Sequence, residues 1–246
     1  REVSDAATVE ATMQAFRLTL RESEVLYWVV KGKTNRDIGD ILGASPATVK
    51  KHLERVYEKL GVEMERGYIK VDSLFRTNVP GISAIGDVIT MGNGPHPQLA
   101  HVSSTEGIIA AERIAGHDVQ PINYGHVPGC TYCDPEIGSV GLTEKAAIEK
   151  GYDVQVGTFP FGVLGRAKMA GETEGFVKIV ADKKYDEILG VHMIGPRSTE
   201  LVAEATLALR LESTVEELIR TIHAHPTMAE AVGEAAHATH GAAIHM

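Results

Sequence analysis

Apolar residues in the first quarter of the chain recur at helical spacing, and polar signals for helix starts lie between them. The segments Thr19–Glu22 and Thr34–Asp37 both fit the capping box, in which two side chains satisfy each other's backbone N–H groups. Ser45-Pro46 combines an N-cap residue with a first-turn proline, and the helix after it is expected to run to about Leu60. Residues 18–63 are therefore predicted to form an all-α head, behind a leader or linker at residues 1–17.

The last of these helices has an apolar stripe and a basic face. The stripe consists of Val49, Leu53, Val56, Tyr57 and Leu60. Lys50, Lys51, His52 and Arg55 lie off that stripe. A three-residue turn, Gly43–Ser45, joins this helix to the preceding one, which predicts a helix-turn-helix whose second helix can enter a DNA major groove. A small helical bundle with a solvated basic face would give the same pattern.

The amino-acid sequence of this region decides between the two interpretations. The stretches LTLRESEVL and GKTNRDIGDILGASPATVKKHLERVYEKLGV closely resemble the DNA-binding domain of LuxR-type response regulators. The resemblance implies that Lys50 and Lys51 face base edges, while Lys33, Thr34 and Thr48 hold phosphates. With Arg55, these residues predict a DNA contact through residues 33–55. Glu54 falls on the same side and would repel phosphate.

The head departs from that family where it ends. A fourth helix, the usual dimer contact, should follow Glu63, but MERGYIKVD follows instead and alternates as a strand does. The apolar face near Val56 and Leu60 is therefore expected to be exposed. A receiver or sensing domain should also precede the head, whereas about 17 residues do.

The middle of the chain, residues 64–122, predicts a piece of an α/β domain. Strands are expected at Gly67–Val71 and Gly81–Ile85, the second ending in Gly86-Asp87. Ligands of α/β sheets bind at the carboxyl ends of strands, so Asp87 is a candidate binding residue. A helix is expected from about Gln98 to Ala115, with free N–H groups at its start.

From about Asn123 the pattern predicts an α+β domain with a mostly antiparallel sheet. Strands are expected at 137–142, 154–159, 176–181 and 188–194, with a hairpin connection at 181–187. Helix starts are expected at Thr143, Ser198 and Thr214, and a last helix after Pro226.

The segment HAHPTMAE is the sharpest local signal in this domain. A residue before proline is kept out of the helical region, so His225 is expected just ahead of the helix that Pro226 opens. From there its ring can fold back onto the Glu230 carboxylate, which would fix the tautomer, as a catalytic acid/base needs. An isolated pair of this kind is more often a histidine capping a helix near a surface glutamate.

The pair stands in a longer resemblance. RGYIKVD, FRTNVPGISAIGDV, QLAHVSSTEGIIAAE, DPEIGSVGLTE, GRAKMAGETEGFVKIVAD, ILGVHMIGP, ELVAEATLAL and HAHPTMAEA occur in the order found in dihydrolipoyl dehydrogenases, which are flavin-dependent disulfide oxidoreductases. The resemblance implies that Asp87 holds the ribityl chain of FAD, that its neighbour Gly86 also belongs to the cofactor site, and that Leu99, Ala100 and His101 lie beside the isoalloxazine ring. It implies that residues 123–246 dimerise, with an identical chain or with a full-length subunit. His225 and Glu230 match the acid/base pair, which acts on the flavin and disulfide of the opposite subunit.

Several parts of that family are missing from the sequence. No G-x-G-x-x-G occurs, since GNGPHP at Gly92 does not fit, and no C-x-x-x-x-C redox pair occurs. The domain that binds NAD in the family is absent too, so only a partial FAD site is expected. The chain is therefore expected to be a truncated relative, inactive alone. Its first residue, Arg1, in place of Met, also predicts a fragment.

Two further patterns suggest metal or redox chemistry at first sight. Cys130-Thr-Tyr-Cys133 is a C-x-x-C, but it falls on a predicted strand, and no second pair could complete a zinc site. Two reduced structural thiols are the favoured interpretation. The histidines near the C-terminus, His223, His225, His237, His240 and His245, are not predicted to bind metal, and the tail is expected to be a frayed surface helix.

Charge and hydropathy limit where the protein could be located and which part of it could bind nucleic acid. Residues 1–66 hold 11 basic and 11 acidic side chains, whereas residues 67–246 hold 13 and 22, so the net charge of −9 lies in the second part. An acidic body disfavours bulk nucleic-acid binding there, while a neutral head can bind DNA through one face. No signal peptide and no membrane span are legible, which predicts a cytoplasmic protein.

The two resemblances meet at Leu60–Glu63, a short segment that both families share. Such a junction favours recombination or sequence misassembly over a fusion favoured by evolution. Three hypotheses follow. The dimerisation domain could offer its His–Glu pair to the flavin of a full-length subunit. It could instead dimerise a DNA-binding regulator in place of the lost fourth helix. The chain could also be an inert chimera of two folded modules.

Overall fold

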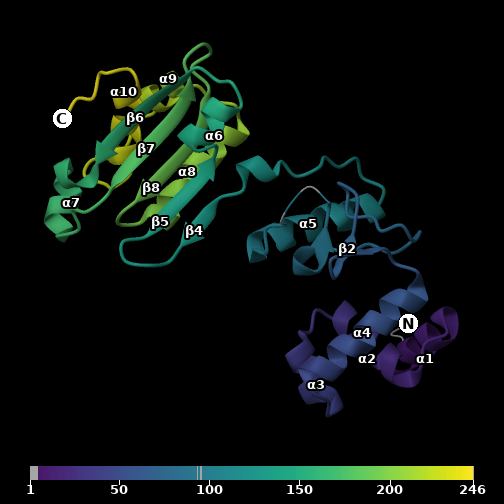
Figure 1. Ribbon diagram of the computed structural model, residues 1–246. Coiled ribbons are helices and arrows are strands. Elements are labelled where there is room, and N and C mark those ends of the chain that lie inside the picture. The colour runs from purple at the N-terminus through teal and green to yellow at the C-terminus, as the bar shows by residue number, and fades with distance from the viewer. Residues whose placement is uncertain (1–4, 93, 95, 246) are drawn as a thin grey trace. The chain divides into compact units, whose positions relative to one another are not determined.

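A computed structural model describes residues 5–92, 94 and 96–245, which fall into two compact units that divide between Ile122 and Asn123 (Figure 1). Asn93 and Pro95, in the GNGPHP segment, lie outside the described residues. The first unit contains helices α1 (Asp5–Phe16), α2 (Leu20–Val30), α3 (Asn35–Leu42), α4 (Pro46–Leu60) and α5 (Ala100–Ile114), and strands β1 (Met64–Glu65), β2 (Tyr68–Lys70) and β3 (Ile89–Thr90). Helix α1 occupies most of the segment expected to be a leader.

The helical head forms as its capping signals predict. Thr19 and Thr34 each close a reciprocal capping box, and the Ser45 side chain accepts a hydrogen bond from Thr48 N at the start of α4. Gly43 ends α3 in the left-handed conformation, at φ 63°. The turn between α3 and α4 is tight enough that a Cβ at Gly39 would lie 2.5 Å from Ala44 O.

The expectation of an exposed apolar face at the end of α4 is wrong. Val56 is 0% exposed, and Leu60 packs against a hydrophobic cluster formed by residues that follow α4. That cluster consists of Val62, Ile69, Val71, Phe75, Ile89 and Ala110. Strands β1 and β2 form an antiparallel hairpin soon after α4, and Ile69 of β2 belongs to this cluster.

A second correction concerns the strand expected at Gly81–Ile85. This segment makes only an isolated bridge, between Ser83 and Arg76, and the regular strand comes later, where β3 pairs in parallel with β2. The chain turns before it can extend the pairing, because Gly86 begins a short 3₁₀ helix, Gly86–Val88. The N–H of Gly86 donates to the buried carboxylate of Glu106 on α5 over 2.6 Å, which fixes that turn.

The second unit is built on an antiparallel sheet in the order β4-β5-β8-β7-β6, which agrees with the predicted class. Its strands are β4 (Gly129–Thr131), β5 (Ile137–Gly141), β6 (Val154–Pro160), β7 (Phe176–Asp182) and β8 (Ile188–Ile194). Its helices are α6 (Glu144–Glu149), α7 (Gly165–Ala170), α8 (Ser198–Arg210), α9 (Val215–Arg220) and α10 (Glu230–Thr239). The expected strands, hairpin and starts of α6, α8 and α9 are therefore confirmed.

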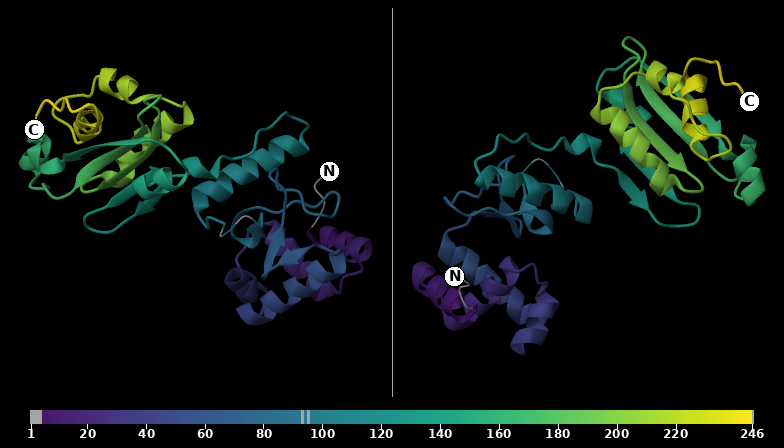
Figure 2. Two further views of the ribbon diagram at one scale, coloured as in Figure 1. Left: turned by 45° about the horizontal axis from the view of Figure 1, so that its top comes forward. Right: turned by 180° about the vertical axis from the view of Figure 1, so that it is seen from behind.

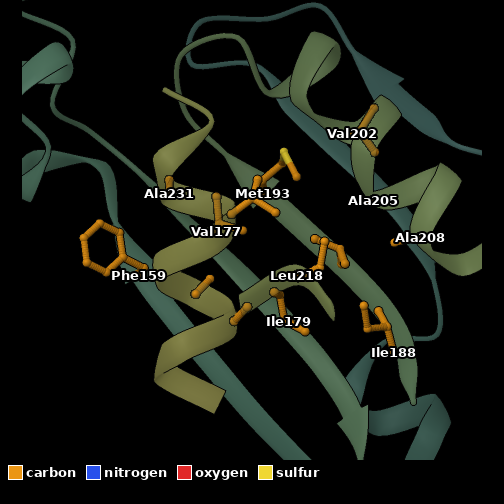
Figure 3. Close-up of a cluster of buried hydrophobic side chains, with 14 of the residues drawn as sticks. Phe159, Val177, Ile179, Ile188, Met193, Val202, Ala205, Ala208, Leu218 and Ala231 are labelled. Carbon is orange, nitrogen blue, oxygen red and sulfur yellow. The ribbon is translucent and has the colours of Figure 1, made fainter. Parts of the chain in front are cut away.

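Helices α8 and α10 cover one face of this sheet (Figure 2). Figure 3 shows how the core forms: Val177 and Ile179 of β7 and Met193 of β8 meet Val202 on α8 and Ala231 on α10. Alternate residues of a strand point to opposite faces, so Val180 instead joins a smaller cluster with Ala147 of α6.

Small residues let α10 approach the sheet closely. A Cβ at Gly157 on β6 would lie 2.2 Å from both Ala235 O and Thr239 Oγ1 of α10. The helix begins at Glu230, four residues later than the proline-based expectation, so Pro226 lies in the preceding loop rather than at the helix start. Across the described part of the chain, no helix has the length and apolar character needed to cross a membrane.

Candidate functional site

The pair predicted from HAHPTMAE is formed. His225 lies in the loop between α9 and α10, and its Nδ1 is 2.7 Å from Oε1 of Glu230, the first residue of α10. The side chain of His225 is 75% exposed, whereas that of Glu230 is 17% exposed. A largely buried carboxylate thus contacts Nδ1 of an imidazole that is itself mostly exposed.

The loop also supplies backbone support to the carboxylate. Thr227 N donates to Oε2 of Glu230 over 2.8 Å. Burial raises the pKa of Glu230, but the hydrogen bonds from Thr227 N and His225 lower it by more, so the pKa lies below its ordinary value. Glu230 is therefore ionised at neutral pH and can only accept, which places the proton of a neutral His225 on Nδ1 and leaves Nε2 free to take one up.

Two more histidine–carboxylate pairs flank this one, and sequence reasoning missed both. His223 Nε2 lies 2.8 Å from Glu204 Oε1 on α8, and His245 Nδ1 lies 2.7 Å from Glu234 Oε1 on α10. The partners are 19 and 11 positions apart, so no local spacing rule relates them. The tail also donates the N–H of Ile244 to Glu234, so it is tied back to α10 rather than forming the frayed helix that was expected.

The predicted DNA-contacting residues lie on one stretch of the head. Lys33, Thr34, Thr48, Lys50, Lys51 and Arg55 are all exposed, on the start of α3 and on α4. The stripe opposite them is buried, with Val49, Leu53 and Val56 on the inner side of α4. Helix α4 therefore presents its basic side chains outward, together with Glu54, which is exposed as well.

Both of the predicted phosphate-binding hydroxyls, those of Thr34 and Thr48, already have structural partners. Thr34 Oγ1 donates to Asp37 Oδ2 over 2.8 Å, and this bond lowers the pKa of the Asp37 carboxyl. Thr48 Oγ1 shares a hydrogen bond with Ser45 Oγ at 2.8 Å. Both hydroxyls stay on the surface at helix N-termini, where backbone N–H groups add to any anion contact.

The predicted flavin contacts gather at one corner of the first unit without enclosing a site. Asp87 is exposed on the 3₁₀ turn, and Gln98, just before α5, donates to Asp87 O over 3.3 Å. Ala100 and His101 are exposed at the start of α5, with Leu99 at its N-cap. A cavity of about 370 Å³ in this unit has other lining residues, Glu65, Arg66, Tyr68, Ile89, Thr90, Gly92, Gly94, His96 and Gln98. FAD binding by these residues stays a prediction.

The cysteines are free thiols in different settings. Cys130 is half-buried on β4, where burial raises the pKa of its thiol. Cys133 is exposed beyond the end of the strand, so the expectation that both lie on that strand is wrong. Among the described residues, no three His, Cys, Asp or Glu side chains gather in a way that could hold a metal ion.

Family models match a part of each unit. Residues 127–236 match the dimerisation domain of the pyridine nucleotide-disulphide oxidoreductases, and residues 17–70 match the bacterial regulatory proteins of the LuxR family. The chain is therefore a fusion of a LuxR-family helix-turn-helix domain with a domain of the disulphide oxidoreductases.

Its relatives in the second family are dihydrolipoyl dehydrogenases. The chain is 47% identical over 189 residues to dihydrolipoyl dehydrogenase of Zymomonas mobilis, covering 76% of this chain and 40% of the relative. It is 50% identical over 188 residues to the Bacillus subtilis enzyme, covering 76% and 39%. The chain thus spans about two fifths of the curated relatives it matches.

Solved structures agree with this assignment. LpdA of Mycobacterium tuberculosis superposes with a TM-score of 0.66 at 31% identity, covering 73% of this chain and 38% of that one. RclA of Escherichia coli, described as an HOCl-induced flavoprotein disulfide reductase, gives 0.66 at 29% identity, covering 72% and 40%.

Proposed function

We propose that residues 123–246 supply His225 and Glu230 as the acid/base pair of a dihydrolipoyl dehydrogenase-type reaction, in a dimer with a subunit that holds the flavin and the redox disulfide. The observation that carries the proposal is the 2.7 Å contact between His225 Nδ1 and an ionised, largely buried Glu230. The dimerisation-domain assignment supplies the means of bringing the pair to another subunit.

The chemistry of this chain in that role is proton transfer. In such a dimer the flavin and disulfide of the other subunit would carry the electrons between a dithiol substrate and NAD. Nε2 of His225 would take the proton of a substrate thiol, because a thiolate and not a thiol attacks a disulfide. Glu230 would stabilise the imidazolium that forms and keep the ring in orientation, as the carboxylate does in other histidine-based sites.

Mixed dimers test this proposal. A full-length dihydrolipoyl dehydrogenase subunit, with its own acid/base histidine replaced by glutamine, is refolded or co-expressed with this chain. Oxidation of dihydrolipoamide is expected to return in the mixed dimer. Dimers that form but stay inactive would end the proposal.

A second function, DNA binding, is supported by a separate observation. The basic residues of α4 point away from its buried stripe, on a helix held by a capped helix-turn-helix. Because the β1–β2 hairpin follows α4 where the LuxR-type family is expected to have its fourth helix, residues 123–246 would provide the dimer contact, and a two-fold dimer reads a palindrome. Selection of bound sequences from random DNA is expected to yield a palindrome; recovery of no preferred sequence would refute this function.

A further inference from the structure

The loop that carries His225 is held less by His225 itself than by its neighbour His223. The side chain of His225 is 75% exposed, and its Nδ1 contacts Oε1 of Glu230. His223, two residues earlier, points inward, with a side chain that is 11% exposed. The two histidines of HAHP thus differ in setting: His225 is exposed to solvent, and His223 is largely buried within the unit.

His223 contacts two helices, α8 and α10. On one side, its Nε2 lies 2.8 Å from Oε1 of Glu204 on α8. On the other side, its ring rests on the backbone of α10, because a Cβ at Gly233 would lie 2.8 Å from Nδ1 of His223. An alanine there would need the ring to move, so Gly233 makes room for the histidine.

The loop between His223 and Glu230 is short, and hydrogen bonds within it limit its movement. Thr227 Oγ1 donates to Ala224 O over 2.6 Å, which ties the residues on either side of His225 together. Thr227 N then donates to Glu230 at the start of α10. The loop is therefore fixed at its beginning by His223 and at its end by Glu230, with His225 between them.

We infer that His223 is a positioning residue for His225: clamped between Glu204 on α8 and Gly233 on α10, it sets the place from which the His225 ring reaches Glu230. The role in turnover rests on the proposed acid/base function, whereas the role in ring orientation does not. The hydrogen bond to Glu204 also raises the pKa of His223, against the opposite effect of burial.

The tautomer of His225 reports its orientation directly. In the full chain, ¹⁵N NMR of the histidine rings at a pH where His225 is neutral is expected to show one tautomer, protonated at Nδ1 and facing Glu230. His223→Ala is expected to give a mixture of tautomers, because the loop is released at one end. His223→Gln, which keeps a donor for Glu204, is expected to restore most of the wild-type signal.

A matched control separates positioning from general damage. His240→Ala removes another histidine–carboxylate pair of the same unit, between His240 and Asp186 at 2.8 Å, and is expected to leave the His225 signal unchanged. An unchanged His225 signal in a folded His223→Ala protein would overturn the inference. If His223→Ala does not fold, Glu204→Ala decides instead, because alanine suits the middle of α8 and the expected mixture of tautomers is the same.

Mixed dimers provide a second readout. His223→Ala is expected to lower kcat by about tenfold without a matching rise in KM, since a misplaced base loses rate rather than binding. A tenfold loss of kcat/KM that comes from a higher KM alone, with kcat unchanged, would contradict a positioning role. Absence of turnover with the wild-type chain would reject the proposed function, while the ¹⁵N signal would still decide whether His223 positions His225.

Discussion

The side-chain amide of Asn78 holds the backbone at the junction, donating from Nδ2 to Gly61 O over 2.8 Å and accepting from Glu63 N over 2.8 Å. Asn78 belongs to the oxidoreductase-like sequence, whereas Gly61 ends the helix of the LuxR-like sequence. The point where two resemblances meet is thus hydrogen-bonded and packed, and not a loose tether between a head and a body.

Loss of this clamp should weaken the first unit. Asn78→Ala removes two hydrogen bonds at an exposed position, which should lower the free energy of unfolding of residues 1–122 by about 1 kcal/mol. Trp28, the one tryptophan of the sequence, lies in this unit, so its fluorescence in urea follows the transition. Asn123→Ala, at the start of the other unit, should leave the Trp28 transition in place; a common shift would show that the effect is not local to the junction.

Local signals in the sequence predicted elements well, and distant partners set the features that were missed. Thr19 and Thr34 predicted helix starts, because a capping box is complete within four residues. The strand expected at Gly81–Ile85 failed because pairing depends on neighbours, and here Glu106, 20 positions away, fixes a turn at Gly86 instead.

The candidate site shows the same division. The His225–Glu230 pair could be predicted, since both residues lie in one loop and the first turn of a helix. The clamp on His223 could not, because Glu204 and Gly233 reach it from two other helices. The only sequence signal for the role of His223 was its place in the HAHP motif, two positions before His225.

The contact between β6 and α10 should tolerate no side chain at Gly157. Alanine there would place its Cβ 2.2 Å from the Ala235 carbonyl oxygen, so α10 must shift from the sheet. We expect Gly157→Ala to destabilise residues 123–246 by about 3 kcal/mol, in the upper range for overpacking, and to disturb Glu230 at the helix start. Circular dichroism in urea measures the loss. Gly165→Ala, which meets nothing within 4 Å, is the matched control and should be nearly neutral.

The first unit should lose stability in acid through Glu22. Burial raises the pKa of Glu22, but hydrogen bonds from Lys59 and Thr19 lower it by more, from 4.5 to about 2. A carboxyl group with a lowered folded-state pKa stabilises the fold above its unfolded pKa, and this stabilisation disappears as the pH falls through the folded value. The relevant window therefore runs from about pH 4.5 down to about pH 2.

Glu22→Gln isolates this contribution. The variant should be less stable than the wild type at pH 7, because Lys59 loses its charged partner 2.6 Å away. The difference should shrink as the pH falls through the window, followed by Trp28 fluorescence at several pH values. A difference that stays constant down to pH 2 would mean that the Glu22 charge does not stabilise the head.

The basic face of the head should separate into positioning and reading residues. Lys33→Ala should weaken binding to all DNA sequences alike and reduce the dependence of log K on log salt by about 1, as loss of one phosphate contact does. Lys50→Ala should cost about 1–3 kcal/mol on the selected sequence and relax specificity at one position. Titrations at several salt concentrations measure both effects. Lys168→Ala, on α7 of the other unit, should change neither.

The measurement that tests the central claim most directly compares two versions of this chain in mixed dimers with a flavin-holding subunit that lacks its own acid/base histidine. The wild-type chain should restore dihydrolipoamide oxidation, and His225→Gln should restore none. Glu230→Gln should restore an intermediate rate, because the chain keeps the His225 base but loses the ionised partner of its ring. Equal rescue by the wild type and His225→Gln, or no rescue by a wild-type chain shown to be dimerised, would contradict the assignment of His225 as the base.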